Sequence, residues 1–136
     1  MDIASAEQQL RQAAEQHELY KDTVKLNGKI VVGRGKSNPD FLFVGEAPGF
    51  TEASEGIPFC GKSGKILDKW IANEKISSYA VINAIPLIPL NEEGKIRAPT
   101  EEEINYFRPY TRQLIEALNP KYIVCVGKSA ANFLEK

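Results

Sequence analysis

The segment from Asp40 to Gly45 constrains the fold more than any other part of the sequence. It places four bulky apolar residues in a row, Phe41-Leu42-Phe43-Val44, and ends at a glycine. An uninterrupted apolar run of this length is typical of a strand that is buried on both faces, and such strands belong to parallel sheets covered by helices. We therefore expect an α/β fold.

The rest of the chain repeats the order of strand, loop and helix. We predict buried strands at Tyr79–Ile82, followed by Asn83, and at Tyr122–Val126, with a short strand candidate at Ile30–Val32. Helices are expected over residues 3–20, 63–74, 100–118 and 128–134. The third helix begins with a capping box of Thr100 and Glu103, and the other stretches, 21–38, 46–61 and 84–99, are expected to be irregular. This order predicts a three-layer α/β/α sandwich with a central parallel sheet.

Length and composition exclude several classes of protein. With 136 residues the chain forms a single domain, 1–136, with an N-terminal helix at 1–20 and a core at 40–136. Its 43% hydrophobic and 26% charged residues are ordinary for a globular protein and unlike a disordered, collagenous or coiled-coil chain. No apolar run approaches the roughly 20 residues of a membrane span, and the N-terminus does not read as a signal peptide. We expect a cytoplasmic protein with no membrane partner.

The cysteine and histidine content indicates that no metal or other cofactor is held. Cys60 and Cys125 stand far apart, and with His17 they are too few for a four-ligand zinc or iron–sulfur site. The apolar surroundings of Cys125 predict a buried core thiol, and we expect both thiols to be free in a reducing compartment. A net charge of -1 means that any nucleic-acid contact requires a local basic patch.

Ligands of parallel α/β sheets bind just beyond the carboxyl ends of the strands. In this chain the rule points to the loop after Gly45, to Asn83, and to Gly127-Lys128-Ser129. Gly56–Ser63 also matches the phosphate-loop pattern G-x-x-x-x-G-K-[ST] letter for letter, so a nucleotide binder is one alternative. However, that segment does not directly follow a strand, and Pro58 removes one N–H group from the supposed cradle.

Two ordered loop motifs carry a more specific signal. The chain reads Gly45-Glu46-Ala47-Pro48-Gly49, then Gly56-Ile57-Pro58-Phe59-Cys60-Gly61, Ser63-Gly64 and Ile66-Leu67, and later a strand that ends in Asn83. From about Gly35 to its end it resembles the uracil-DNA glycosylase superfamily, especially the family-four type and its phage relatives. The resemblance implies a sandwich with a four-stranded parallel sheet. It also implies hydrolysis of the N-glycosidic bond of uracil, or a related damaged base, flipped out of DNA in base-excision repair, with uracil-containing DNA as the partner, single-stranded or with the base flipped out.

The resemblance assigns the base-binding residues. Asn83 would read the pairing edge of the base and Phe59 would stack on it, beside Ala47, Pro48 and Gly49. One fixed amide can distinguish uracil from cytosine because the wrong base leaves buried polar groups unpaired. The alternatives are that Asn83 merely ends a strand and that Phe59 is a loop anchor packed into the core.

The resemblance also assigns carboxylates to the sugar of the nucleotide, and N–H groups would contact a DNA phosphate. Glu46 and Glu52 match acidic positions of the motif and would orient water and stabilise positive charge on the sugar. Gly61, Lys62 and Ser63, at the start of the helix, would contact a DNA phosphate, with Lys65 and Lys69 on the same helical face as Lys62. The alternative is that these charged side chains are simply solvated.

Three departures from the family pattern matter. Cysteines of the family-four iron–sulfur cluster are absent from Met1–Pro39 and from the places around Leu87 and Phe107, so we expect a cluster-free relative. The superfamily's C-terminal His-Pro-Ser segment is missing, and its role does not transfer to His17. The expected fourth strand is also missing, which makes the domain C-terminally short. We therefore expect an unpaired edge at Tyr122–Val126 that favours self-association. A catalytically weak or inactive homologue or fragment, which only binds uracil or single strands, remains an alternative.

Overall fold

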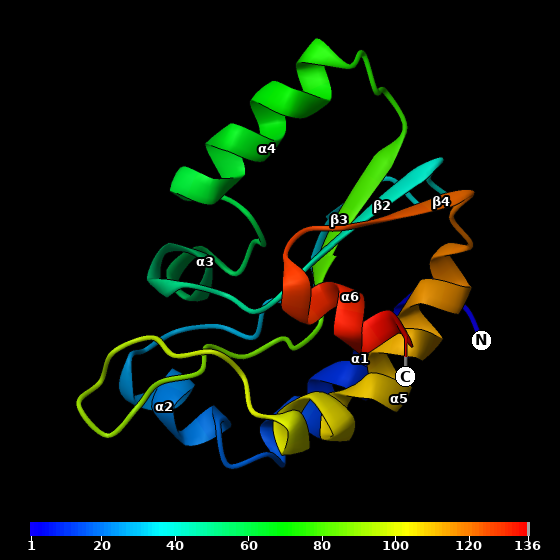
Figure 1. Ribbon diagram of the computed structural model, residues 1–136. Coiled ribbons are helices and arrows are strands. Elements are labelled where there is room, and N and C mark those ends of the chain that lie inside the picture. The colour runs from blue at the N-terminus through cyan, green and yellow to red at the C-terminus, as the bar shows by residue number, and fades with distance from the viewer. Residues whose placement is uncertain (136) are drawn as a thin grey trace.

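The computed structural model describes residues 1–135 of the chain (Figure 1). Its elements in chain order are α1 (Ile3–Glu15), α2 (Tyr20–Lys25), β1 (Gly33–Gly35), β2 (Phe41–Gly45), α3 (Phe50–Glu55), α4 (Lys62–Asn73), β3 (Tyr79–Asn83), α5 (Glu101–Leu118), β4 (Tyr122–Cys125) and α6 (Lys128–Glu135). Within this part of the chain, no helix has the length and apolar character to cross a membrane.

The sheet has four strands in the order β1-β3-β2-β4. β2 pairs in parallel with both β3 and β4, as expected from the apolar run at its centre. The short strand was wrongly placed at Ile30–Val32: it is Gly33–Gly35, and it pairs antiparallel with β3. The reason is that the Val31 N–H donates to the carbonyl of Pro86, outside the sheet, so pairing with β3 starts only at Gly33.

Successive residues of the central strands point to opposite faces and build two apolar layers. Leu42 and Ile82 face α1, α5 and α6, whose buried side chains fill the larger core. Phe43 and Val81 face α4, where Leu67 and Ile71 cover them in the smaller core. Figure 1 shows the same three layers, with α4 on one side of the sheet and α1, α5 and α6 on the other. The predicted α/β/α sandwich is confirmed.

The capping box before α5 is confirmed at atomic detail. Thr100 Oγ1 accepts from the Glu103 N–H at 3.2 Å, and a Glu103 carboxylate oxygen accepts from the Thr100 N–H at 2.8 Å. The helix ends at Asn119, whose φ of 50° lies in the left-handed region before Pro120. Packing of α1 against α5 is reinforced by Tyr106, whose hydroxyl donates to the carbonyl of Ala13 at 2.8 Å.

Two short helices were missed in segments expected to be irregular. The six residues of α2 bury only Thr23, so their sequence carries no helical apolar stripe. In α3 the signal is local: Glu52 accepts a hydrogen bond from the N–H of Gly49, and Gly56 ends the helix with a φ of 76°. The helix expected over residues 3–20 likewise ends at Glu15.

The expectation of a buried third strand was also wrong. Within the described structure β4 is the edge strand, paired only with β2, and Tyr122 and Ile123 are 61% and 43% exposed. Cys125, expected in the core, is exposed for the same reason. An apolar sequence does not reveal whether a strand has one neighbour or two.

Candidate functional site

The carboxyl ends of β2 and β3 define the candidate site. Gly45 and Asn83 are register partners at the ends of these parallel strands. The chain remains paired just beyond them, because the Ala84 N–H donates to the Gly45 carbonyl at 2.8 Å. The last residues of both strands are therefore rigidly placed relative to each other.

A cavity of about 340 Å³ opens at this edge. Its volume lies in the range of small-molecule pockets. Most of the residues singled out from the sequence line it, namely Glu46, Ala47, Pro48, Gly49, Glu52, Phe59, Ser63 and Asn83. Side chains that lie far apart in the chain thus share one space.

Asn83 offers the cavity an unpaired amide oxygen. Its side chain is only 6% exposed, yet its Oδ1 atom has no hydrogen-bond partner among the described residues. A buried acceptor without a donor costs about 1–3 kcal/mol. This cost is removed when a ligand in the cavity donates to Oδ1, so the Asn83 amide is poised for a ligand with an N–H group.

Phe59 lies beside Asn83 across a glycine. A Cβ atom added to Gly45 would approach Phe59 Cζ to 2.3 Å and Asn83 Oδ1 to 2.6 Å. The ring and the amide therefore converge on the same bare stretch of backbone. Phe59 is half-buried, with one part of its ring against the smaller core and another lining the cavity. The Phe59 side chain therefore packs against the core, as the loop-anchor alternative requires, and also borders the cavity, where stacking on a base stays a prediction.

The backbone of Phe59 is held in a conformation that side chains rarely adopt. Its φ is 53°, in the left-handed region. Two neighbours maintain it. Arg34 of β1 donates from Nε to the Pro58 carbonyl at 2.9 Å and from Nη2 to the Phe59 carbonyl at 3.4 Å. Gly64 leaves room for the Phe59 carbonyl, which would lie 1.7 Å from a Cβ at that position.

Glu52 connects the two loop motifs. One carboxylate oxygen accepts from the Gly49 N–H at 3.0 Å, and the other accepts from the N–H groups of Cys60 and Gly61 at 3.1 and 2.8 Å. The carboxylate is therefore engaged by three backbone donors. This arrangement makes Glu52 a residue that joins the loops around the cavity.

Glu46 is the contrasting carboxylate. It is half-buried, lines the cavity, and its side chain forms no hydrogen bond or ion pair with the rest of the described chain. An unengaged carboxylate at the cavity wall can accept a proton from a water or stabilise positive charge on a ligand. Of the two predicted acidic residues, Glu46 has the geometry that suits direct chemistry.

The three residues predicted to bind phosphate differ in placement. Ser63 lines the cavity, Lys62 is exposed at the first position of α4, and the Gly61 N–H is already bound by Glu52.

The same contacts argue against a phosphate loop at Gly56–Ser63. A carboxylate of the chain itself occupies N–H groups that such a loop would present to phosphate, and the preceding element is α3, not a strand.

Sequence reasoning missed the opposite wall of the cavity. Pro89, Ile96, Arg97 and Val126 also line it. The segment that carries the first three folds back through a bridge between Leu90 and Ile96. The available signal was Asn91, whose side-chain oxygen accepts from the N–H groups of Glu93 and Lys95 and forms a turn before Gly94.

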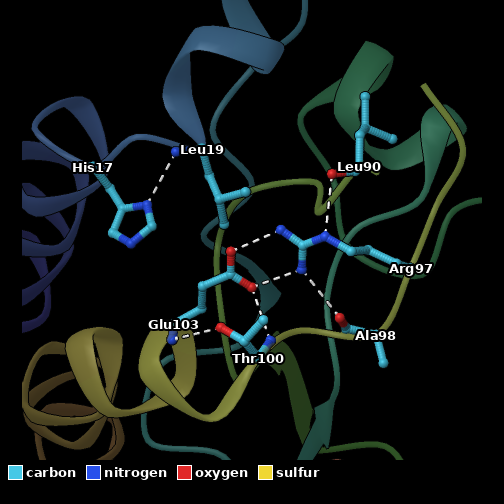
Figure 2. Close-up of polar contacts among 7 residues, drawn as sticks. All are labelled: His17, Leu19, Leu90, Arg97, Ala98, Thr100 and Glu103. Carbon is cyan, nitrogen blue, oxygen red and sulfur yellow. Dashed lines mark hydrogen bonds and ion pairs between the residues drawn. The ribbon is translucent and has the colours of Figure 1, made fainter. Parts of the chain in front are cut away.

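Arg97 anchors this wall to α5. Its guanidinium forms a two-pronged ion pair with Glu103, with both N–O distances at 2.8 Å, and donates to the carbonyls of Leu90 and Ala98. Figure 2 shows Glu103 lying between Arg97 and the capping Thr100. The hydrogen bonds from Arg97 are the main cause that lowers the pKa of Glu103 below 4.5. A fixed carboxylate thus holds the wall in place.

His17 and the cysteines lie outside the cavity lining. The His17 Nδ1 atom accepts from the Leu19 N–H at 3.0 Å, the imidazole packs on Phe107, and burial lowers its pKa (Figure 2). Burial raises the pKa of the Cys60 thiol, which therefore stays protonated at neutral pH.

The residues present do not fit the iron–sulfur cluster of the family-four type. Leu87 and Phe107, which stand where its cysteines would be expected, are fully buried in the larger core and offer no donor atoms. The described residues contain no group of three or more His, Cys, Asp or Glu side chains that could hold a metal ion.

Comparisons with known proteins find a matching family model and several similar relatives. The family model described as uracil DNA glycosylase superfamily matches residues 32–136. The type-4 uracil-DNA glycosylase of Archaeoglobus fulgidus is 35% identical over 115 residues, which cover 83% of this chain and 56% of that protein. Those of Saccharolobus solfataricus and Thermotoga maritima are 34% and 33% identical, over 82% and 76% of this chain and 51% and 53% of theirs. The chain spans about half the length of the curated relatives it matches.

Proposed function

Because this chain belongs to the uracil DNA glycosylase superfamily, we propose that its cavity binds a uracil flipped out of DNA and that the chain hydrolyses the N-glycosidic bond. One observation carries the proposal. The buried and unpaired Oδ1 of Asn83 lies beside the ring of Phe59, at the end of the sheet, in a cavity of about 340 Å³.

Asn83 supplies the discrimination between bases. Uracil presents an N3–H donor and an O4 acceptor, which match the oxygen and nitrogen of one side-chain amide. Cytosine presents an acceptor at N3 and donors at N4, so it leaves Oδ1 of Asn83 unpaired. A site built to hydrogen-bond one pattern rejects the reverse pattern strongly because buried polar groups lose their partners.

Phe59 contacts the base of the flipped nucleotide, and Glu46 acts at its sugar. The ring of Phe59 stacks on the base, a contact worth about 1–3 kcal/mol. The carboxylate of Glu46 orients a water whose oxygen bonds to the sugar C1′ carbon. The bond from C1′ to N1 breaks with its electron pair going to the base. Glu46 takes up the proton lost by the water, and the departing base is protonated from solvent. Glu52 shapes the site through the loops that it joins.

The test is abasic-site formation on a short single strand with one uracil. We expect product with the wild-type chain, none with a thymine strand, and a loss of at least about tenfold with Asn83→Ala, since one paired amide is worth more than about 1.4 kcal/mol in a dry site. Asn83→Asp is the matched variant, because it keeps size and Oδ1 but replaces the donor to O4. Equal product from the wild type and Asn83→Ala would refute the role of Asn83.

Binding without hydrolysis is the second candidate function. One observation favours it. Three N–H groups engage Glu52, so among the described lining residues only one carboxylate, that of Glu46, is left for the chemistry. In that case uracil-containing strands bind with an affinity that falls with salt, and no abasic product forms. Glu46→Gln separates the two functions: under hydrolysis it removes product and keeps binding, and under binding alone it changes neither.

We also propose that copies of the chain associate through β4. The strand pairs on one side only within the described structure, and Tyr122 and Ile123 are exposed on it. Unpaired edges of this kind favour strand-to-strand association. Sedimentation should show a dimer that Ile123→Lys dissociates, whereas a monomer at all concentrations would contradict association.

A further inference from the structure

The outward face of α4 carries an uncommon mixture of residues for a solvent-exposed helix. Lys62, Lys65 and Lys69 are exposed, and beside them lie Ile66 and Trp70, which are 73% and 44% exposed. Spacings of three and four residues place all five on one contiguous side of the helix. Leu67 and Ile71, on the other side, bury α4 against the sheet. We call the five exposed residues the α4 face.

Positive charge on the α4 face is not neutralised by the chain. None of its three lysines forms an ion pair with another described residue. The one carboxylate within α4, Asp68, is bound by Arg34 at 3.0 Å. A net charge of -1 for the whole chain makes this patch a local feature that suits a polyanion.

Trp70 adds an aromatic surface to the patch. Its indole forms a T-shaped contact with the ring of Phe43, with ring centroids 5.9 Å apart and planes at 83°. With 44% of the residue exposed, part of the side chain is open to solvent. A rigid aromatic ring among lysines is the arrangement that binds single-stranded nucleic acid, because bases stack on the ring while lysines contact phosphates.

The α4 face is continuous with the candidate cavity. Ser63, in the first turn of α4, lines the cavity, and Phe59 lies in the loop that leads into the helix. Figure 1 shows α4 extending from this loop along the outer edge of the molecule. A strand whose base occupies the cavity therefore meets the α4 face with its neighbouring nucleotides.

From these observations we infer that the α4 face binds the single-stranded DNA that flanks the flipped base. This inference rests on the proposed function and adds to it a path for the strand. Lys62, Lys65 and Lys69 contact successive phosphates, and Trp70 stacks on an unpaired base. The occupant is a single strand, because stacking on Trp70 needs a base that is free of its own partner.

The chain offers a direct probe, since Trp70 is its single tryptophan. A short single strand with a central uracil and a fluorescent label is titrated with the wild-type chain, and both label anisotropy and tryptophan emission are followed. We expect binding by anisotropy and quenching of Trp70 emission with the same midpoint. Double-stranded DNA with no uracil should bind without quenching.

Charge variants test the lysines independently. The double variant Lys65→Gln, Lys69→Gln should flatten the dependence of log K on log salt by about 0.7 for each phosphate that is no longer neutralised, so by about 1.4. The matched control is Lys36→Gln, Lys121→Gln, which removes the same charge from exposed lysines at the opposite edge of the sheet, beside Tyr79 and Asp40. The control should keep the slope of the wild type.

The outcomes distinguish failure of this inference from failure of the proposed function. Quenching together with a slope change confined to the α4 variant supports the inference. Binding by anisotropy with unchanged Trp70 emission and equal slopes in both double variants overturns it and leaves the proposed function intact. Absence of any binding to the uracil strand overturns both.

Discussion

Arg34 holds Phe59 by its carbonyl oxygen, although 25 positions separate them in the chain. The guanidinium also binds the Pro58 carbonyl and the carboxylate of Asp68, so it joins β1, the loop and α4. Because the backbone of Phe59 is in the left-handed region, it needs such support to persist. The position of the Phe59 ring therefore depends on a residue outside the cavity lining.

Replacing Arg34 should weaken binding of uracil strands without touching the cavity lining. Arg34→Lys keeps the charge near Asp68 but loses the planar fork that reaches both carbonyls, at a cost of about 1 kcal/mol for each hydrogen bond. We expect Kd for a uracil-containing single strand, measured by anisotropy, to rise about fivefold or more. Asp68→Asn is the control, since it removes the ion pair and keeps both carbonyl contacts. Equal Kd values for wild type and Arg34→Lys would show that Phe59 needs no such support.

Substitution of Gly45 should close the site with little backbone strain. Its φ is not in the left-handed region, but a Cβ would approach the Phe59 ring to 2.3 Å and displace it. We expect Gly45→Ala to lose about 1–3 kcal/mol of binding, the value of the stacking contact. Gly94→Ala is the contrasting variant, because Gly94 has a φ of 78° and open space around it. Gly94→Ala should lower Tm and leave Kd unchanged. An unchanged Kd in Gly45→Ala together with a raised Kd in Gly94→Ala would contradict the geometry.

Glu52 should act on stability as well as on activity. In Glu52→Gln the side chain keeps one acceptor oxygen and gains a donor that faces the N–H groups of Gly49, Cys60 and Gly61. Hydrogen bonds to a charged acceptor are worth about 1.5–3 kcal/mol, so we expect the free energy of unfolding to fall by about that amount. Urea denaturation measures it, with Glu55→Gln on the same helix as control. An unchanged stability with lost product would instead assign Glu52 to the chemistry.

Stability should fall in acid through Glu103. Hydrogen bonds from Arg97 lower its pKa from 4.5 in the folded chain, so its contribution is complete above that pH and is lost as pH falls through the lower folded value. Denaturation followed from neutral pH to well below 4.5 should show this loss in the wild type. The curve of Glu103→Gln should start lower, by about 1.5–3 kcal/mol, and be flatter in that range.

Two comparisons make the acid prediction specific. Glu102→Gln removes an exposed carboxylate from the same turn of α5 and should retain the acid-dependent loss. His17 contributes in a higher range, because burial lowers its pKa from 6.5 and the unfolded chain takes up the proton first. A Glu103→Gln curve parallel to that of the wild type below pH 4.5 would contradict the role of the ion pair with Arg97.

Residues at strand ends were predictable from the sequence, and the walls of the cavity were not. Gly45 and Asn83 end apolar runs, and the carboxyl ends of parallel strands meet at one edge, so their proximity follows from the pattern. Pro89 and Ile96 reach the cavity only because the chain folds back through the bridge from Leu90. Arg34 lies in a glycine-punctuated segment with no periodicity, and its partners are far away in sequence.

One side chain was misjudged from the sequence, and the contacts of another could not be foreseen. The three N–H donors around Glu52 come together only when both loops are folded, so the sequence alone does not show that this carboxylate is engaged. The apolar run that ends at Cys125 reads like that of β2, and what differs is the number of neighbouring strands, which no local pattern records. Both the neighbours of β4 and the donors to Glu52 are set by long-range contacts.

The internal carboxylate of Glu52 has a consequence for the cost of recognition. Loops that close on an anion usually become ordered only when the ligand arrives, and that ordering subtracts from affinity. Here the chain supplies its own anion, so the turns around Gly49 and Gly61 are already shaped before DNA arrives. Under the proposed function, the free energy of binding the base would then be available to offset the cost of unstacking it.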